Sequence, residues 1–122
     1  MKKFLCLLIA VSGLAISASA QTKITAKEAA QHIGDSLMVC DKVYGGRFFE
    51  PNGLTLLNLG GAFPNHQLTV VMKADVRKKF AAAPETAFAN KDVCVLGKIT
   101  EYRGKPQIEI YDIKQLVADE KK

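Results

Sequence analysis

The sequence contains few of the residues from which catalytic centres are usually built, with only two histidines among its 122 residues. His32 and His66 lie far apart in the sequence, and neither stands beside a recognisable nucleophile or a second ligand. The Walker loop, the Rossmann glycine pattern and the G-x-S-x-G elbow are all absent. The acidic pair Asp119-Glu120 belongs to the terminal tail, where nothing would hold two carboxylates in a fixed geometry. We therefore expect no catalytic residues and a chain that is not an enzyme.

Cysteine is also scarce, and no two cysteines stand in the close C-x₂-C spacing of a zinc site. Cys6 lies in the amino-terminal apolar run, which leaves Cys40 and Cys94, each alone in an apolar stretch. We accordingly expect no metal site and no cofactor. A disulfide between Cys40 and Cys94 suits an oxidising compartment, but a free cysteine also suits a buried apolar strand. Both states stay open, because a bridge depends on geometry that the sequence does not give.

No apolar run reaches the roughly 20 residues that a membrane span requires. The longest, Phe4 to Ile16, follows two lysines and ends in the small residues at 17–20. This is the design of a cleavable secretory signal peptide, and a lipoprotein cysteine is missing at the cleavage point. We predict a signal peptide over residues 1–20 and a single domain over residues 21–122. The expected location is the periplasm or the extracellular medium, with no membrane anchor after cleavage.

A strong excess of positive charge is missing as well. Without Lys2 and Lys3, the fifteen remaining basic residues exceed the twelve acidic residues by three. Nucleic-acid-binding domains usually carry a more basic, clustered surface. The mild excess is thus compatible with an anionic partner but does not require one, and the length suffices for one core.

The remaining sequence alternates between extended apolar patterns and turn residues, and these patterns predict mainly β-structure. A capping-box spacing between Thr25 and Glu28 predicts a short helix that ends at Gly34. Pro84 should end a second helix. The predicted elements, in order, are a helix over 25–34, a strand over 36–43, a long loop over 44–53, a hairpin of strands 54–59 and 67–72, a helix over 74–83, and a hairpin of strands 92–102 and 106–113 around a tight turn, followed by a frayed tail over 118–122.

Five strands with a helix between the third and fourth is the order of a five-stranded Greek-key barrel, the OB-fold. A weak internal similarity supports this interpretation, since Val39–Val43 resembles Val95–Ile99. In such a barrel these two segments, on the first and fourth strands, should be neighbours.

The last predicted hairpin also has a familiar sequence. The segment Gly97-Lys-Ile-Thr-Glu-Tyr-Arg-Gly-Lys-Pro-Gln-Ile108, continuing into Glu109-Ile110, together with Leu57–Gly61 and Pro64-Asn65, resembles bacterial exported OB-fold domains of the nucleic-acid-binding type. The resemblance covers nearly all of the chain after the signal and implies both the fold and nucleic-acid binding. Asp41 departs from the family pattern, because a small glycine is common there. This difference implies a β-bulge unlike that of the family and a negative charge beside the expected binding face.

OB-folds bind ligands across the second and third strands and between the loops that join strands one to two and four to five. Aromatic rings there can stack on bases, and cations can contact phosphates. The candidate ligand-binding residues are Tyr44, Arg47, Phe48 and Phe49 in the first loop, Asn58, Thr69 and Lys73 along the two strands, and Tyr102, Arg103 and Lys105 in the second loop.

Each candidate has a simpler interpretation. Phe48 or Phe49 could close one end of the barrel, and Arg103-Gly104-Lys105 could be an ordinary solvated turn. The polar residues of the strands could be outward positions of half-exposed strands. The basic cluster over 77–79 is expected on a solvated helix face rather than at a phosphate site.

The first functional hypothesis is an exported binding module that holds single-stranded nucleic acid, or another anionic polymer, without sequence preference. The alternative is a periplasmic protein-interaction or envelope-stress module that uses the same barrel face to bind a partner protein or peptide. Oligosaccharide binding through the same aromatic loops is a third hypothesis.

Overall fold

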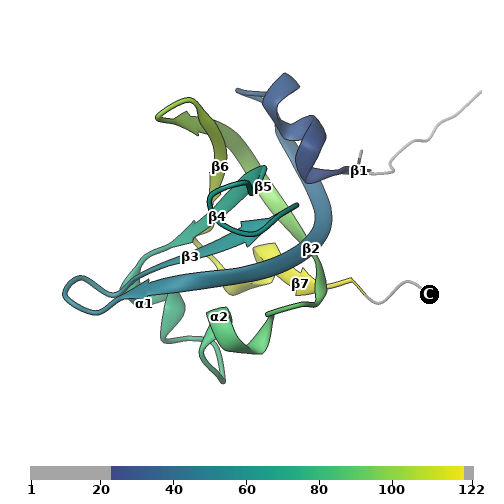
Figure 1. The fold of residues 1–122 in the computed structure, drawn as a ribbon. Coiled ribbons are helices and arrows are strands. Elements are labelled where there is room, and N and C mark those ends of the chain that lie inside the picture. Colours follow the sequence, from purple (N-terminus) through teal and green to yellow (C-terminus); the bar gives the residue numbers. More distant parts are fainter. Residues whose placement is uncertain (1–22, 120–122) are drawn as a thin grey trace, which may run out of the picture.

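The computed structural model describes residues 23–119, so the predicted signal peptide and residues 120–122 lie outside the described residues. The strands and short helices in this range follow one another as shown in Figure 1. They are β1 (Lys23–Ile24), the 3₁₀ helix η2 (Ala26–Gln31), β2 (Ser36–Phe49), β3 (Leu54–Leu59), β4 (Leu68–Met72), α1 (Ala74–Arg77), α2 (Pro84–Ala87), β5 (Asp92–Tyr102), β6 (Lys105–Glu109), the 3₁₀ helix η3 (Ile113–Gln115) and β7 (Leu116–Ala118).

The prediction of a mainly β chain is confirmed. Within residues 23–119, seven strands form one mixed sheet, and five of them follow each other in a partial ring. Strand β2 pairs antiparallel with β3 and with β5, β3 pairs antiparallel with β4, and β5 pairs antiparallel with β6. The link between β4 and β6 is parallel. The expected contact between the first and fourth predicted strands is therefore present, because Val39 lies opposite Val95 in the β2–β5 pair.

Alternation along the strands fills the inside of this ring with branched aliphatic side chains. On β3, for example, Thr55, Leu57 and Leu59 are fully buried, while the residues between them are half-buried. The same pattern places Ile108 and Ile110 inside at the other end of the chain. The fully buried large side chains are Val39, Val43, Leu57, Leu59, Leu68, Val70, Met72, Val93, Val95, Ile99, Ile108 and Ile110. Burial of a side chain of this size contributes about 1.5–3 kcal/mol, so this cluster is the main source of stability.

The predicted long loop over 44–53 is wrong. Strand β2 continues through Gly45-Gly46 to Phe49, and only residues 50–53 connect it to β3. A shift of register between Val43 and Gly45 marks a β-bulge, which lets the first half of β2 pair with β5 and the second half with β3. A side chain at Gly46 would collide with the Leu56 carbonyl oxygen and the Leu57 side chain. The two glycines therefore allow β2 to bend and β3 to approach it closely, although the same residues had predicted a loop.

The single predicted helix over 74–83 is also wrong in extent. Helix α1 ends at Arg77, and a second short helix begins at Pro84, where proline occupies the first turn. Figure 1 shows both helices together at one end of the sheet, beside β3. They close that end of the core through Val76, which is buried.

Arg77 joins the two helices to the strands and is not on a solvated face, unlike the exposed Lys78 and Lys79. Its guanidinium donates hydrogen bonds to Glu85 at 2.6 and 3.2 Å and to the buried Thr55 hydroxyl at 2.8 Å. The guanidinium carbon lies 3.7 Å from the centre of the Phe48 ring. Phe48 thus belongs to the closed end of the ring, as the simpler interpretation of this residue held.

The hydrogen bonds from Arg77, the largest cause, together with its positive charge hold the pKa of Glu85 below its ordinary value of 4.5, against an opposing effect of burial. A depressed pKa in the folded state adds stability above the ordinary pKa, and this stability is lost as the pH falls through the depressed value. Replacing Glu85 with Gln should therefore lower the free energy of unfolding near pH 7, and this difference should shrink below about pH 4.5. Urea unfolding of the wild type and of Glu85→Gln between pH 3 and 7 measures this difference, with Glu50→Gln in the exposed loop as the control. A difference in the free energy of unfolding that stays constant across this pH range would contradict the prediction.

The amino-terminal helix is confirmed as a short 3₁₀ segment. Glu28 accepts a hydrogen bond from the Thr25 backbone N–H at 2.9 Å, as the capping-box spacing predicted. Asp41, the departure from the family pattern, accepts a hydrogen bond from the Ala26 N–H at 2.9 Å. Its carboxylate therefore attaches the first turn of η2 to β2.

The carboxyl-terminal region forms more structure than predicted. Strand β6 ends at Glu109 rather than 113, and η3 and β7 follow it. Strand β7 pairs with β5, so Ala118 is part of the sheet rather than of a frayed tail. Cys40 and Cys94 lie directly opposite each other in the β2–β5 pair and form a disulfide with a Cα–Cα distance of 4.1 Å.

Candidate binding cleft

The outer face of the ring carries a continuous row of side chains that strand register brings together. On β3 the outward positions are Leu54, Leu56 and Asn58, and the cross-strand partners of the last two are Val71 and Thr69 on β4. The parallel pairing then places Gln107 of β6 beside Thr69. Two consecutive strands, β3 and β4, and the later strand β6 thus supply one surface.

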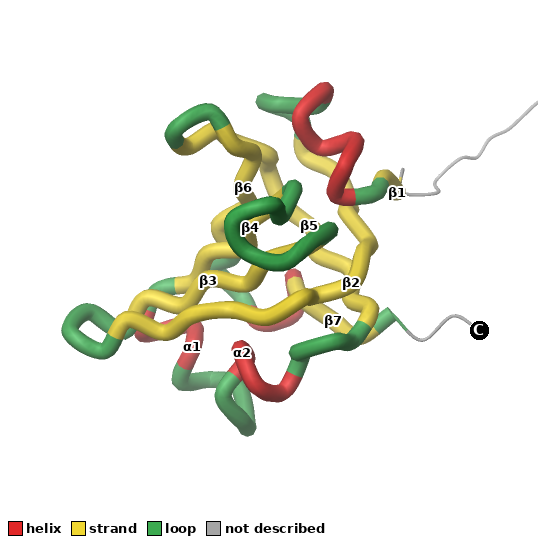
Figure 2. The backbone as a smooth tube through the Cα atoms, in the orientation of Figure 1, coloured by secondary structure: helices red, strands yellow, loops and turns green. Residues whose placement is uncertain are grey.

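This surface forms the floor of a cleft of about 640 Å³. Ligand sites in proteins usually have volumes of about 300–1,000 Å³ and mostly apolar walls. The cleft extends from the end of the β2–β3 hairpin to the β5–β6 turn, and its lining includes residues of this turn and of the loop between β3 and β4. Figure 2 shows this loop and this turn in green. Its lining consists of Phe49, Leu54, Leu56, Phe63, His66, Thr69, Val71, Tyr102, Arg103, Lys105, Pro106 and Gln107.

Two of the aromatic rings in this lining are unusually open to solvent. Phe63 is 69% exposed and Tyr102 is 58% exposed. Phe63 lies in the loop between β3 and β4, and its ring is stacked on that of His66 with 5.8 Å between the centroids. Exposure of a large apolar ring costs free energy that burial against a ligand would recover.

The β5–β6 turn presents the cations of the cleft. Arg103 and Gly104 both have positive φ, of 53° and 82°, as the turn of a two-residue hairpin requires. The predicted tight turn is confirmed, and it projects Tyr102 and Lys105 from the same register position of β5 and β6. The Arg103 guanidinium lies 5.2 Å from the Tyr102 ring centre, so a cation and an aromatic face stand together at the edge.

Lys105 also fixes one wall of the cleft. Its ammonium donates a hydrogen bond of 2.7 Å to the Pro64 carbonyl oxygen and ties β6 to the loop between β3 and β4. An ammonium has three donors, so Lys105 retains capacity for an anion. Burial, as the larger cause, and the positive charge of Lys105 lower the pKa of His66 from its ordinary value of 6.5. His66 is therefore neutral near pH 7 and contributes an uncharged ring.

Five of the ten candidate residues line the cleft together: Phe49, Thr69, Tyr102, Arg103 and Lys105. The other five, Tyr44, Arg47, Phe48, Asn58 and Lys73, do not line it, and the Phe48 ring contacts Arg77 instead. Arg47 is adjacent, because its cross-strand partner Leu56 lies in the floor and its guanidinium is 5.1 Å from the Phe49 ring centre.

The remaining three have other contacts. The Tyr44 ring lies 5.2 Å from the Lys42 ammonium, and Lys73 pairs with Glu109 at 3.7 Å. Asn58 lies in the outward row but beyond the lining residues.

The apolar floor of the cleft and the side formed by Phe63 and His66 were not predicted from the sequence. Leu54, Leu56 and Val71 were interpreted as ordinary strand residues, because outward and inward leucines look alike in an apolar strand. Phe63 and His66 lie on either side of Pro64-Asn65, in the connection of the first predicted hairpin, and neither was predicted to bind a ligand. A phenylalanine in the connection between two predicted strands was the available signal.

No protein-family model matches the chain, and no curated protein matches it significantly. Among solved structures, the fold is similar to part of a protein described as an aspartyl-tRNA synthetase of Leishmania major Friedlin, with a TM-score of 0.52 and 8% sequence identity. The likeness covers 86% of this chain and 22% of that protein. At this identity it concerns the fold alone.

Within residues 23–119, no helix has the length and apolar character needed to cross a bilayer.

Proposed function

We propose that the chain is an exported, non-enzymatic binding module with a five-stranded Greek-key OB-fold, and that its cleft binds single-stranded nucleic acid or another anionic polymer without sequence preference. The partial ring β2-β3-β4-β6-β5 supports this fold, since OB-folds are partly open barrels. Strands β3 and β4 then correspond to the second and third strands of the barrel, the face through which OB-folds bind ligands.

The observation that carries the proposal is the combination of exposed rings with cations around one apolar floor. Phe63 and Tyr102 offer stacking surfaces, and Arg103 and Lys105 stand at the same cleft. Every base has an aromatic face, so stacking of this kind tolerates any sequence. Few uncharged polar groups of the lining could form hydrogen bonds with base edges. They are the side chains of Thr69 and Gln107, the His66 ring and the Tyr102 hydroxyl.

Titration of fluorescently labelled single-stranded oligonucleotides tests this function. We expect binding at low salt that weakens as salt rises, with a slope of log K against log salt of about −1.5 to −2 for two or three neutralised phosphates. Homopolymers of different bases should bind within about an order of magnitude of one another, because stacking differs little between bases. Absence of binding at low salt would overturn the proposal.

A protein or peptide partner is the second candidate, and the apolar character of the floor favours it. Leu54, Leu56, Val71 and Pro106 would bury an apolar side chain as readily as a base. Binding of this kind depends little on salt, whereas phosphate contacts depend on it strongly. Capture from envelope extract of a protein that is not displaced by high salt would favour this candidate, and recovery of nucleic acid alone would count against it.

A further inference from the structure

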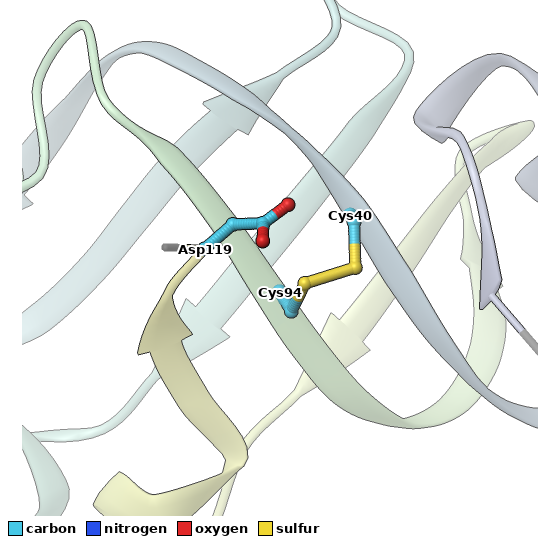
Figure 3. A group of neighbouring side chains, drawn as sticks. All are labelled: Cys40, Cys94 and Asp119. Carbon is cyan, nitrogen blue, oxygen red and sulfur yellow. A yellow bond between two sulfur atoms is a disulfide. The ribbon is translucent and has the colours of Figure 1, made fainter. Parts of the chain in front are cut away.

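A second cluster of reactive side chains lies on the sheet away from the cleft, on the adjacent strands β2 and β5 and at the residue that follows β7. Cys40 lies opposite Cys94, and Cys94 lies opposite Val117, so alternation places Asp119 on the same face as both cysteines. The Asp119 N–H donates to the Asp92 carbonyl oxygen at 2.8 Å, which fixes its backbone beside β5. Figure 3 shows the Asp119 carboxylate directed toward the two sulfur atoms.

The three ligand-type atoms of Cys40, Cys94 and Asp119 all lie within 4.8 Å of one another. In a tetrahedral zinc site with bonds of about 2.3 Å, two sulfur ligands are about 3.8 Å apart. In the structure the two sulfurs are bonded to each other. After reduction, rotation of the two cysteine side chains about their own bonds would separate the sulfurs to a ligand distance.

The cluster also has an opening to solvent. A hollow of about 230 Å³ lies beside it, lined by Lys23, Ile24, Thr25, Glu28, Cys40 and Asp119. It shares no lining residue with the binding cleft. The hollow opens the Cys40 side of the disulfide to a reductant and an ion, whereas Cys94 is buried, and it leaves room for water as a fourth ligand.

We propose that Cys40, Cys94 and Asp119 form a redox-gated site for one thiophilic divalent cation such as Zn²⁺. In the oxidised state the sulfurs are bonded to each other and offer no thiolate. Two thiol groups of an external reductant transfer two electrons and two protons to the disulfide, which yields two cysteine thiols and one reductant disulfide. Zn²⁺ then displaces the two thiol protons and binds two thiolates and the Asp119 carboxylate, a mixed sulfur and oxygen set that suits zinc.

No metal site was expected from the sequence, because no two cysteines stand in the close spacing of a zinc site. Here the two cysteines are 54 residues apart, and the pairing of β2 with β5 brings them together. The third ligand, Asp119, directly follows β7, in the segment over 118–122 that was predicted to be a frayed tail.

Zinc titration of the protein reduced with a phosphine, which leaves no competing thiol, tests the proposal. We expect the reduced protein to bind one equivalent of Zn²⁺, and the oxidised protein to bind none, in competition with a chromophoric chelator. Replacing Asp119 with Asn should weaken binding about tenfold or more, since removal of even an outer-shell partner costs 10- to 100-fold. Asp75→Asn, in the exposed first turn of α1, is the matched control and should bind as the wild type does.

Three results would overturn the proposal: equal binding by the oxidised and reduced proteins, no binding by the reduced protein, or equal affinities of the wild type and Asp119→Asn. Circular dichroism covers the case in which reduction unfolds the chain. Restoration of the β spectrum by one equivalent of Zn²⁺ would then support the site, because metal binding is coupled to folding. Failure of Zn²⁺ to restore it would overturn the proposal. None of these outcomes depends on whether the cleft binds nucleic acid.

Discussion

Replacing Phe63 and Tyr102 together with alanine should weaken the binding of a single-stranded oligonucleotide by about 30-fold or more. Each stacked base contributes about 1–3 kcal/mol, and two such contacts would be lost. Both rings are mainly exposed, so the double variant should remain folded. Fluorescence titration at low salt measures the loss, and circular dichroism checks the fold.

Tyr111→Ala is the matched control for this experiment. Tyr111 is 72% exposed, which is more than either cleft ring, but it does not line the cleft. Its removal should leave the affinity unchanged. If the double variant and Tyr111→Ala bind equally well, the exposed rings of the cleft do not form the stacking surface.

Replacing Cys40 and Cys94 with alanine should lower the free energy of unfolding by about 2–4 kcal/mol. The bridge closes a loop between residues 54 positions apart, and a loop of this length restricts the unfolded chain strongly. For a domain of this size the loss corresponds to a fall in melting temperature of roughly 10–20 °C. The bridge also joins β2 to β5. Its removal should therefore weaken the pairing between these two strands.

Reduction of the wild type provides the control. It should produce the same loss of stability, whereas the alanine variant should not respond to a reductant. Addition of Zn²⁺ should return stability to the reduced wild type but not to the alanine variant, because an ion that binds only the folded state stabilises it. A melting temperature that changes by only about a degree on removal of both cysteines would contradict the predicted role of the bridge.

The strands could be predicted from the sequence because their inward positions alternate with period two. Ile108 and Ile110 illustrate this, and both are fully buried. The glycines of β2 misled the prediction for the opposite reason. Gly45-Gly46 is typical of a loop, but here it produces a bulge within a strand, and only the approach of Leu56 and Leu57 decides between the two.

The part of the cleft that could be predicted from the sequence is the part formed by residues of a short turn. Arg103-Gly104 is recognisable as a hairpin turn from sequence, so Tyr102 and Lys105 could be placed on either side of it. The apolar floor was not predictable, since whether Leu56 faces the core or the cleft depends on register with β4. The disulfide and the Asp119 contact depend likewise on pairing between strands that are distant in the sequence.

Amide chemical-shift mapping tests most directly whether the outer face of β3 and β4 is the binding site. An oligothymidylate of about ten nucleotides, within the range that an OB-fold covers, would be titrated into the isotopically labelled protein. We predict that the largest shifts occur in β3, in β4, in the loop between them and in the β5–β6 turn, while η2 and β7 remain unchanged. Binding that instead perturbs η2 and β7 and leaves the cleft residues unaffected would contradict this assignment.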